Sequence, residues 1–312
     1  MPLILESVPC AVCGETASSL EAIGQDYMYQ SCPDSFRMVR CHQCQHIYLN
    51  PRPTSEMASV IYPTTYYSYA GTMSVPNSLM RYVKRAVVTR RFRRVVGHGA
   101  KGRVLEVGCG DGDLLVSLRA AYPNLELVGL DFRFHPEIAK RLSGDGIEMI
   151  TGMAETALLP EASFDIVIMN QLIEHLWEPD RVLSACQRAM RPGAILTLET
   201  PNPESYDRRS FREGLWGAYY FPRHLNLFSP SNLQRLLERN GFQVVRQINL
   251  LGPLNWIFTV HSISRSVPSL GWLRRLFSMT NPIPIAGFAA IDVVFRALGL
   301  QTSNQKIVAV RR

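Results

Sequence analysis

The chain has 312 residues, of which 46% are hydrophobic and 19% charged, and its formal net charge is +7. This composition is typical of a globular protein with a sizeable core, and the modest positive charge does not by itself indicate a nucleic-acid or lipid partner. No run of 18 uncharged apolar residues and no basic, apolar leader occur, so we expect a cytoplasmic protein without a membrane-spanning helix or secretory signal.

The first 70 residues contain two cysteine pairs at metal-binding spacing. Cys10 and Cys13 form the first pair, and Cys41 and Cys44 form the second. Two C-x-x-C pairs complete the tetrahedral Cys₄ set typical of structural Zn²⁺, and four buried thiols without a metal are the alternative. A closed Cys₄ set has no open coordination position. We therefore expect it to stabilise a module over residues 1–70 and not to catalyse.

A tyrosine-rich segment and a basic segment follow the cysteines. Tyr62, Tyr66, Tyr67 and Tyr69 either line a substrate mouth or pack the module onto the next domain, and the sequence leaves both open. Residues 77–96 alternate basic and apolar side chains at roughly helical spacing, which predicts a helix. We expect its basic face to be solvated, with contact to anionic lipid or a phosphate-bearing substrate as the alternative.

A glycine-rich turn lies within residues 104–113. A short apolar strand ends in glycines at alternate positions, Gly108, Gly110 and Gly112, and an apolar helical pattern follows. A strand that passes through such a turn into a helix brings backbone N–H groups and a positive helix end close to a ligand. The turn therefore predicts a cofactor site.

The acidic residues of this turn select between cofactors. A dinucleotide-binding fingerprint needs a third glycine where this chain has Asp113. Glu106, Asp111 and Asp113 would place three carboxylates next to the pyrophosphate of a dinucleotide, and the repulsion between these negative charges is unfavourable. S-adenosylmethionine (SAM) has no phosphate, and its ammonium group needs acidic or carbonyl partners. The pattern resembles the first motif of class I SAM-dependent methyltransferases, and we expect Glu106 to order the loop and meet that ammonium through backbone or water.

Strands and helices alternate through the predicted SAM-binding core, residues 71–250. This alternation predicts an α/β, Rossmann-like fold with a seven-stranded, mostly parallel sheet and helices on both faces. Asp131 ends the second strand, where an acid can accept both ribose hydroxyls. The family usually has aspartate where Met153 stands, so the adenine is expected to meet the Met153 sulfur and a polar group of Glu155 or the backbone. The cofactor-binding residues expected beyond the turn are Asp131, Phe132, Met153, Ala154, Glu155, Asn170 and Gln171.

The Glu-His-Leu sequence at residues 174–176 resembles the fourth motif of small-molecule methyltransferases. Enzymes that methylate nucleobase amines instead place Asn/Asp-Pro-Pro-aromatic here, a sequence that this chain lacks. A nucleic-acid acceptor is therefore not expected. Glu174 and His175 are either a base with its orienting carboxylate or part of the wall of the cofactor cleft.

A long aromatic loop spans residues 215–229, and a loop of this length is expected to cover substrate. Together with the cysteine pairs and Asn-Pro-Arg-Pro at 50–53, it resembles bacterial methyltransferases that act on sugars and glycans and hold a histidine at this place. The resemblance favours His224 as the general base for an acceptor hydroxyl, with a histidine that only bonds a backbone carbonyl as the alternative. Tyr220 is a further catalytic candidate, and Arg223 is a candidate for binding an acceptor carboxylate or phosphate.

Residues 251–306 separate the sixth strand from the last strand, expected at 307–312. They mix apolar side chains with tryptophan and arginine, which resembles helices that lie in a membrane surface. Packing on the domain and a dimer contact are the alternatives. Peripheral contact with the inner face of a membrane is thus one expectation for this insertion, and the oligomeric state is not predicted.

The resemblance to sugar and glycan methyltransferases implies SAM-dependent methylation of a hydroxyl on a sugar or glycan precursor, which could be linked to a lipid. Related sugar C-methyltransferases carry a larger C-terminal domain, so its absence favours transfer to oxygen over transfer to carbon. One rival is methylation of a quinone or another small aromatic hydroxyl. Another is a zinc-dependent nucleic-acid-binding protein with a degenerate SAM fold, which would need basic and aromatic residues interleaved on one face.

Overall fold

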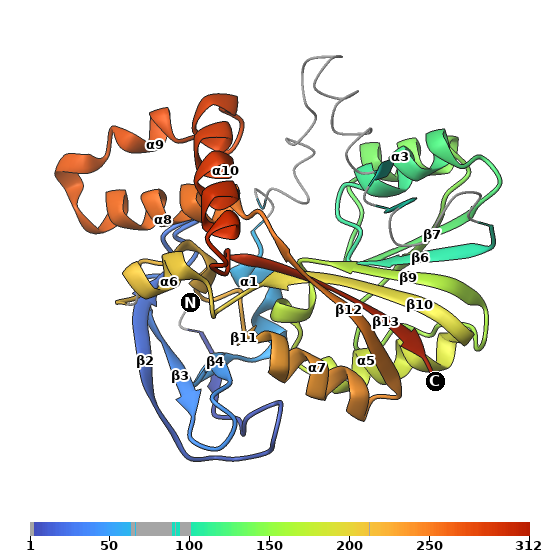
Figure 1. Ribbon diagram of the computed structural model, residues 1–312, viewed down its shortest axis with the longest axis horizontal. Helices are drawn as coiled ribbons and strands as arrows, with labels where there is room; N and C mark the ends of the chain where they lie inside the picture. The colour runs from blue at the N-terminus through green and yellow to red at the C-terminus, as the bar shows by residue number, and fades with distance from the viewer. Residues whose placement is uncertain (1–2, 64–65, 67–88, 91, 94–100, 212) are drawn as a thin grey trace.

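The computed structural model describes residues 3–63, 66, 89–90, 92–93, 101–211 and 213–312. A large sheet occupies the centre of the molecule, and a small N-terminal sheet lies at one end (Figure 1). Three helices from the C-terminal part lie on the same side of the central sheet as the small sheet (Figure 1). The predicted helix at 77–96 falls almost entirely outside the described residues, as do Tyr67 and Tyr69. Within the described residues, no helix has the length and apolar character needed to cross a membrane.

The central sheet has seven strands in the order β12-β13-β10-β9-β6-β7-β8. Only β13 runs antiparallel to its neighbours, so the predicted Rossmann-like, mostly parallel sheet is confirmed. The strands are β6 (Arg103–Val107), β7 (Glu126–Asp131), β8 (Glu148–Thr151), β9 (Phe164–Asn170), β10 (Met190–Pro201), β12 (Phe242–Leu250) and β13 (Asn304–Arg311).

Helices cover both faces of this sheet. Successive side chains of a strand point to opposite faces, and in β6 Val104 packs with α3 (Asp113–Ala121) and α4 (Pro136–Gly144). Leu105, the next residue, belongs to the other core, with α5 (Pro179–Ala189) and α7 (Pro230–Arg239). The sheet is therefore buried on both sides, and ligands reach it only at the ends of its strands.

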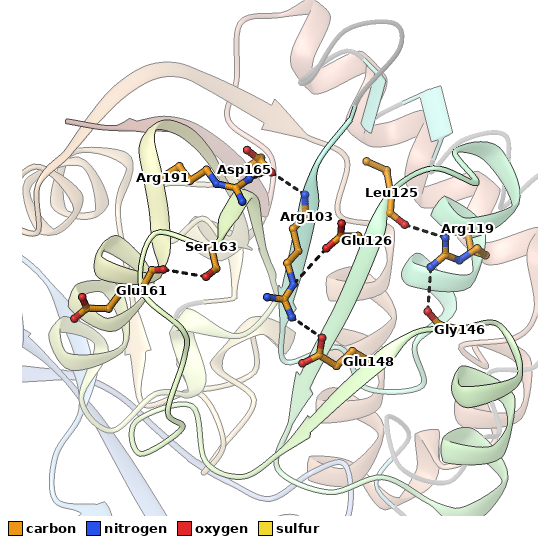
Figure 2. Close-up of polar contacts among 10 residues, drawn as sticks. All are labelled: Arg103, Arg119, Leu125, Glu126, Gly146, Glu148, Glu161, Ser163, Asp165 and Arg191. Carbon is orange, nitrogen blue, oxygen red and sulfur yellow. Dashed lines mark hydrogen bonds and ion pairs between the residues drawn. The ribbon is translucent and has the colours of Figure 1, made fainter.

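Polar contacts tie together the amino ends of four parallel strands (Figure 2). Arg103 at the start of β6 pairs with Glu148 at the start of β8 and lies 4.0 Å from Glu126 of β7. Its backbone N–H donates to Asp165 of β9 over 2.7 Å, and Arg191 also donates to this carboxylate. With this edge closed by ion pairs, the carboxyl ends of the strands form the open edge of the sheet.

The N-terminal module contains a four-stranded sheet, in the order β11-β4-β3-β2, and a small ladder of β1 with β5. One edge strand, β11, comes from the aromatic loop far along the chain, so the sheet is not made by residues 1–70 alone. The module's elements are β1 (Leu5–Glu6), β2 (Ser18–Gln25), β3 (Ser35–Cys41), β4 (Ile47–Leu49), β5 (Arg52–Pro53), η1 (Ser55–Met57), α1 (Ala58–Ile61) and β11 (Asn226–Leu227).

One strand boundary differs from the sequence prediction. The last strand begins at Asn304 and not at residue 307, because its first residues pair with the ends of β10 and β12. In β10, pairing with β9 stops after Met190 and resumes at Ile195. The Arg-Pro-Gly sequence at 191–193 lies in this interruption, and Gly193 has a φ of +78°, as in a turn.

Short helical elements and the C-terminal insertion complete the chain. The predicted helical insertion lies between β12 and β13, and helices occupy most of residues 253–297. The remaining elements are η2 (Ile173–His175), α6 (Tyr206–Ser210), η3 (Gly217–Tyr219), α8 (Pro253–Ser266), η4 (Pro268–Leu270), α9 (Leu273–Leu276) and α10 (Pro282–Ala297).

Candidate active site

The glycine turn after β6 has the backbone geometry that only glycine adopts readily. Gly108, Gly110 and Gly112 have φ angles of +74°, +54° and +71°. The Gly110 N–H donates to Asp131 Oδ2 over 2.7 Å, which links the end of β6 to the end of β7. A Cβ on Gly108 would lie 2.8 Å from a methyl group of Leu172. The turn therefore holds the backbone against both neighbouring strands, as a cofactor turn requires.

Two buried carboxyl groups lie at this turn. Glu106 is 5% exposed, and its Oε2 has no hydrogen-bond partner in the described part of the chain. Burial, reinforced by Asp111, Asp131 and Asp113, raises the pKa of Glu106 well above its usual value. Burial also raises the pKa of Asp131 to about 6, although the Gly110 N–H opposes this shift. Glu106 Oε2 can accept from an ammonium group, and Asp131 can accept from ribose hydroxyls in addition to the Gly110 N–H, so these carboxyls fit SAM.

A cavity opens at the carboxyl edge of the sheet beside this turn. Most residues predicted to bind the cofactor line it: Gly108, Gly110, Asp131, Phe132, Met153, Ala154, Glu155, Asn170 and Gln171. Glu106 and Gly112 do not line it. Gly112 instead begins α3, and a Cβ there would lie 2.5 Å from a methyl group of Leu142.

The cavity wall also contains residues that the sequence prediction did not assign to a site. Trp177 is one of them, and its backbone N–H donates to Glu155 Oε1 over 3.1 Å. Tyr62 and Tyr66 contribute from the N-terminal module, in line with the substrate-mouth alternative. The further residues are Ala58, Leu130, Gly152, Leu172 and Leu176. The only sequence signal for Trp177 is its place directly after the Glu-His-Leu motif.

Three of the predicted catalytic side chains meet next to the cavity. Glu174 is completely buried; its Oε2 accepts from Thr200 Oγ1 over 2.8 Å, while its Oε1 has no hydrogen-bond partner among the described residues. Glu174 Oε1 lies 3.9 Å from His224 Nε2. The rings of His175 and His224 are 4.6 Å apart. One possible ligand atom from each of Glu174, His175 and His224 lies within 4.8 Å of the other two, so the three residues could also hold a metal ion.

Nδ1 of each histidine contacts a backbone carbonyl oxygen. His224 Nδ1 lies 2.7 Å from the Ala218 carbonyl oxygen, and His175 Nδ1 lies 3.0 Å from the Arg223 carbonyl oxygen and 2.9 Å from the Tyr62 hydroxyl. Since a carbonyl oxygen only accepts, Nδ1 carries the proton in His224, and its Nε2 keeps its lone pair. In His175 the Tyr62 hydroxyl is a second partner of Nδ1 and can either donate or accept. Burial lowers the pKa of His224 to about 4 and that of His175 well below its usual value.

The members of this cluster differ in their access to the cavity. His175 lines it, whereas Glu174, His224 and Tyr220 lie behind that wall. The Tyr220 ring is 5.0 Å from the His224 ring and stacks on Phe258 of α8 at 5.4 Å. His224 is only 7% exposed. The structure thus brings the predicted catalytic residues together, with His175 nearest to the cofactor space.

Arg223 is not available to bind an acceptor, which corrects the sequence prediction for this residue. Its guanidinium is completely buried and donates to both oxygens of Asp26, over 2.9 and 2.8 Å. Because both charges are paired inside the protein, this arginine fastens the aromatic loop to the N-terminal module.

The four cysteines of the two C-x-x-C pairs converge. The Cys10 and Cys44 sulfurs are 3.5 Å apart, as are those of Cys13 and Cys41, and all four sulfurs lie within 4.8 Å of one another. Thiolates bound to one Zn²⁺ at about 2.3 Å in a tetrahedron stand about 3.8 Å apart. The cluster therefore fits the predicted structural metal site.

Comparison with known proteins identifies the same kind of domain. A family model described as a methyltransferase domain matches residues 78–247. A probable S-adenosylmethionine-dependent methyltransferase of Mycolicibacterium smegmatis is 33% identical over 153 residues, which cover 48% of this chain and 55% of that protein. The chain thus spans about half the length of that relative. A ubiquinone biosynthesis O-methyltransferase of Dinoroseobacter shibae is 28% identical, covering 54% of this chain and 74% of that enzyme.

Solved structures agree on the fold. Phosphoethanolamine N-methyltransferase 2 of Haemonchus contortus, determined in complex with SAM, superimposes with a TM-score of 0.52 at 14% identity. The match covers 95% of this chain and 68% of that enzyme.

Proposed function

Because the chain belongs to the SAM-dependent methyltransferase family, whose domain model matches residues 78–247, we propose that it methylates a hydroxyl group of a small-molecule acceptor. The acceptor we favour is a sugar or a glycan precursor. The observation that carries the proposal is the histidine pair: His175 lines the cavity, and His224 has an Nε2 lone pair next to a buried carboxyl group.

The cavity supports one orientation of the cofactor. The SAM ammonium would meet the region of Glu106, and the ribose hydroxyls would meet Asp131 at the end of β7. Phe132 and Met153 line the cavity where the adenine would follow. SAM supplies an electrophilic methyl group, and this arrangement would direct it toward the side of the cavity that holds His175. The enzyme's main task is then to align the hydroxyl, the methyl group and the sulfur in line.

His224 is the member of the pair that we propose as general base. Transfer to oxygen needs the hydroxyl proton removed as the oxygen attacks. The pKa of His224 is lowered less than that of His175, and its Nε2 faces the Glu174 carboxyl group at 3.9 Å. An ionised Glu174 stabilises the imidazolium that forms. Because His175 lines the cavity and His224 does not, the acceptor hydroxyl would have to enter past His175 for its proton to reach His224 Nε2.

Aromatic side chains support a ring-shaped acceptor. Tyr62, Tyr66 and Trp177 line the cavity, and such flat, partly polar surfaces pack well against sugar rings. They also suit an aromatic ring. A quinone precursor is therefore the second candidate, favoured by the relatives named as ubiquinone biosynthesis O-methyltransferases.

We also propose that Cys10, Cys13, Cys41 and Cys44 hold one structural Zn²⁺. The module carries β4, which pairs with β11 just after His224, so the metal would support the loop that carries the base. It would take no part in methyl transfer, because four thiolates fill its coordination sphere.

Methyl transfer from labelled SAM to glycan-precursor and quinone-precursor extracts tests the function. His224→Ala is expected to bind SAM as the unmodified enzyme does in calorimetry and to lose at least about 100-fold in turnover. His135→Ala removes an exposed histidine at the start of α4 and should leave both properties unchanged. Full turnover by His224→Ala would rule out the base, and no heat on adding SAM to the unmodified enzyme would rule out the whole proposal.

A further inference from the structure

The insertion before the last strand forms a helical arm, residues 253–298, made by α8, α9 and α10. It stands beside the central sheet, and α9 marks its outer end (Figure 1). The arm has its own packed interior: Trp256 of α8 stacks on Phe288 of α10 at 5.5 Å, and its indole N–H donates to Asp292 over 3.0 Å. The helices of the arm therefore pack against one another through their inner faces, and their outward faces are not needed to form that interior.

The outward face of α10 is apolar along its whole length. Positions spaced by three or four residues share one side of a helix, and Ile283, Gly287, Ala290, Val294 and Leu298 are all exposed at this spacing. Exposure reaches 79% at Ile283 and 68% at Leu298. Eight exposed large apolar side chains belong to the arm: Val267, Trp272, Leu276, Ile283, Ile291, Val293, Val294 and Leu298. A contiguous apolar surface of this kind normally has a partner.

The charges on the arm are of one sign. Its arginines, Arg265, Arg274, Arg275 and Arg296, all reach solvent at least in part. The only acidic residue of the arm, Asp292, is 1% exposed and accepts from Gly252 N–H and Trp256. Exposed Trp272 precedes two of these arginines, and tryptophan with arginine is the combination that favours the boundary between water and lipid.

We propose that the helical arm docks the enzyme onto an anionic phospholipid bilayer. The apolar face of α10 and Trp272 would enter the headgroup boundary, while the arginines meet lipid phosphates. A second copy of the chain is a poorer occupant, because pairing two arms would bring clusters of like charge together.

The arm is joined to the candidate active site. Thr259 of α8 accepts the Gly217 N–H over 2.8 Å, and Phe258 stacks on Tyr220 beside the histidine pair. A docked arm would therefore fix the orientation of the cavity relative to the bilayer. If the proposed function holds, this orientation fits an acceptor carried on a lipid, whose head group reaches the cavity while its chain stays in the membrane.

Vesicle co-sedimentation of the full chain tests the docking without using methyl transfer. We expect binding to vesicles that contain phosphatidylglycerol and weak binding to phosphatidylcholine alone, with a loss at high salt. Val294→Glu combined with Leu298→Glu should weaken binding at least about tenfold, because charges would have to enter the apolar boundary. Leu158→Glu is the matched control, since Leu158 is 94% exposed outside the arm.

Arg275→Glu tests the electrostatic part, with Arg246→Glu on β12 as the control that changes the net charge equally. We expect about tenfold weaker binding for the first and little change for the second. Equal vesicle binding by the unmodified chain and the Val294→Glu, Leu298→Glu variant would overturn the proposal. So would a lipid-free dimer that this variant dissociates, which would assign the face to a second copy. SAM binding is measured in the same samples. Loss of vesicle binding with SAM binding retained concerns only the docking proposal, whereas absence of SAM binding concerns the proposed function.

Discussion

Replacing Glu174 by glutamine would isolate the buried carboxyl group of the histidine cluster. Glu174 is completely buried, and burial raises its pKa from 4.5 to about 8. The folded protein therefore holds this proton more tightly than the unfolded chain does. The associated stability is fully present below about pH 4.5 and is lost as the pH rises through about 8. Each pH unit well inside this window costs about 1.4 kcal/mol, and the slope falls near pH 8, so the unmodified protein should lose about 2 kcal/mol between pH 6 and 8 that Glu174→Gln keeps.

Urea unfolding of both proteins across this pH range measures the difference. Subtracting one free energy of unfolding from the other removes the groups that the two proteins share. Glu178→Gln, which removes an exposed carboxylate close by, should unfold in parallel with the unmodified protein at every pH. Parallel curves for Glu174→Gln as well would refute the argument that burial holds this carboxyl group protonated.

The same variant has a consequence for turnover. Only the ionised Glu174 stabilises an imidazolium at His224, so turnover of the unmodified enzyme should rise with pH up to about 8. Glu174→Gln should stay at least about tenfold below it at pH 8 and show no such rise, with SAM affinity unchanged. A full pH profile in the variant would mean that the base acts without this carboxylate.

Three further predictions concern the supports of the site. Arg223→Met leaves Asp26 buried without its partner and should cost about 3 to 5 kcal/mol in urea unfolding, with part of the loss recovered when Asp26→Asn is added; a variant as stable as the unmodified protein would contradict the role of the pair. Cys41→Ser should abolish the one Zn²⁺ per chain that metal analysis is expected to find and should lower the unfolding temperature; unchanged metal content would exclude the Cys₄ site. Gly108→Ala should weaken SAM binding about tenfold in calorimetry, because its φ of +74° strains any side chain, whereas Gly144→Ala in α4 should have no such effect.

The fold was largely predictable because its signals are local. Apolar runs bounded by turns mark the parallel strands, and the glycine turn with Asp131 at the end of the next strand marks the cofactor edge. Strand boundaries were predicted wrongly where pairing with a neighbouring strand overrides the local preference of the residues. Met190 lies before the Arg-Pro-Gly sequence at 191–193 and still belongs to β10, because it pairs with Phe164 of β9. Asn304 has no strong strand preference and joins β13 because it pairs with the ends of two neighbours.

Site residues that belong to a local sequence motif could be predicted. Residues whose role depends on a contact with a distant part of the chain could not. Glu174 and His175 belong to a recognisable motif, and they lie beside the cavity. The role of Arg223 depends on Asp26, which lies 197 positions earlier. A charged residue in an aromatic loop suggests an acceptor contact when only its neighbours are known. The strand formed by Asn226–Leu227 is too short to give a pattern of its own, and only its pairing with β4 reveals it.

The aromatic loop connects the N-terminal module and the helical arm to the two histidines. Its Ala218 carbonyl fixes the proton on His224, and its Arg223 carbonyl oxygen lies 3.0 Å from His175 Nδ1. The loop is itself held by the N-terminal module through the Asp26 ion pair and by the arm through Thr259. The N-terminal module also reaches the site directly, because Tyr62 lines the cavity and its hydroxyl lies 2.9 Å from His175 Nδ1. The helical arm contributes none of the described residues that line the cavity. Damage to the arm should therefore lower turnover by disturbing the histidine pair while leaving SAM affinity intact.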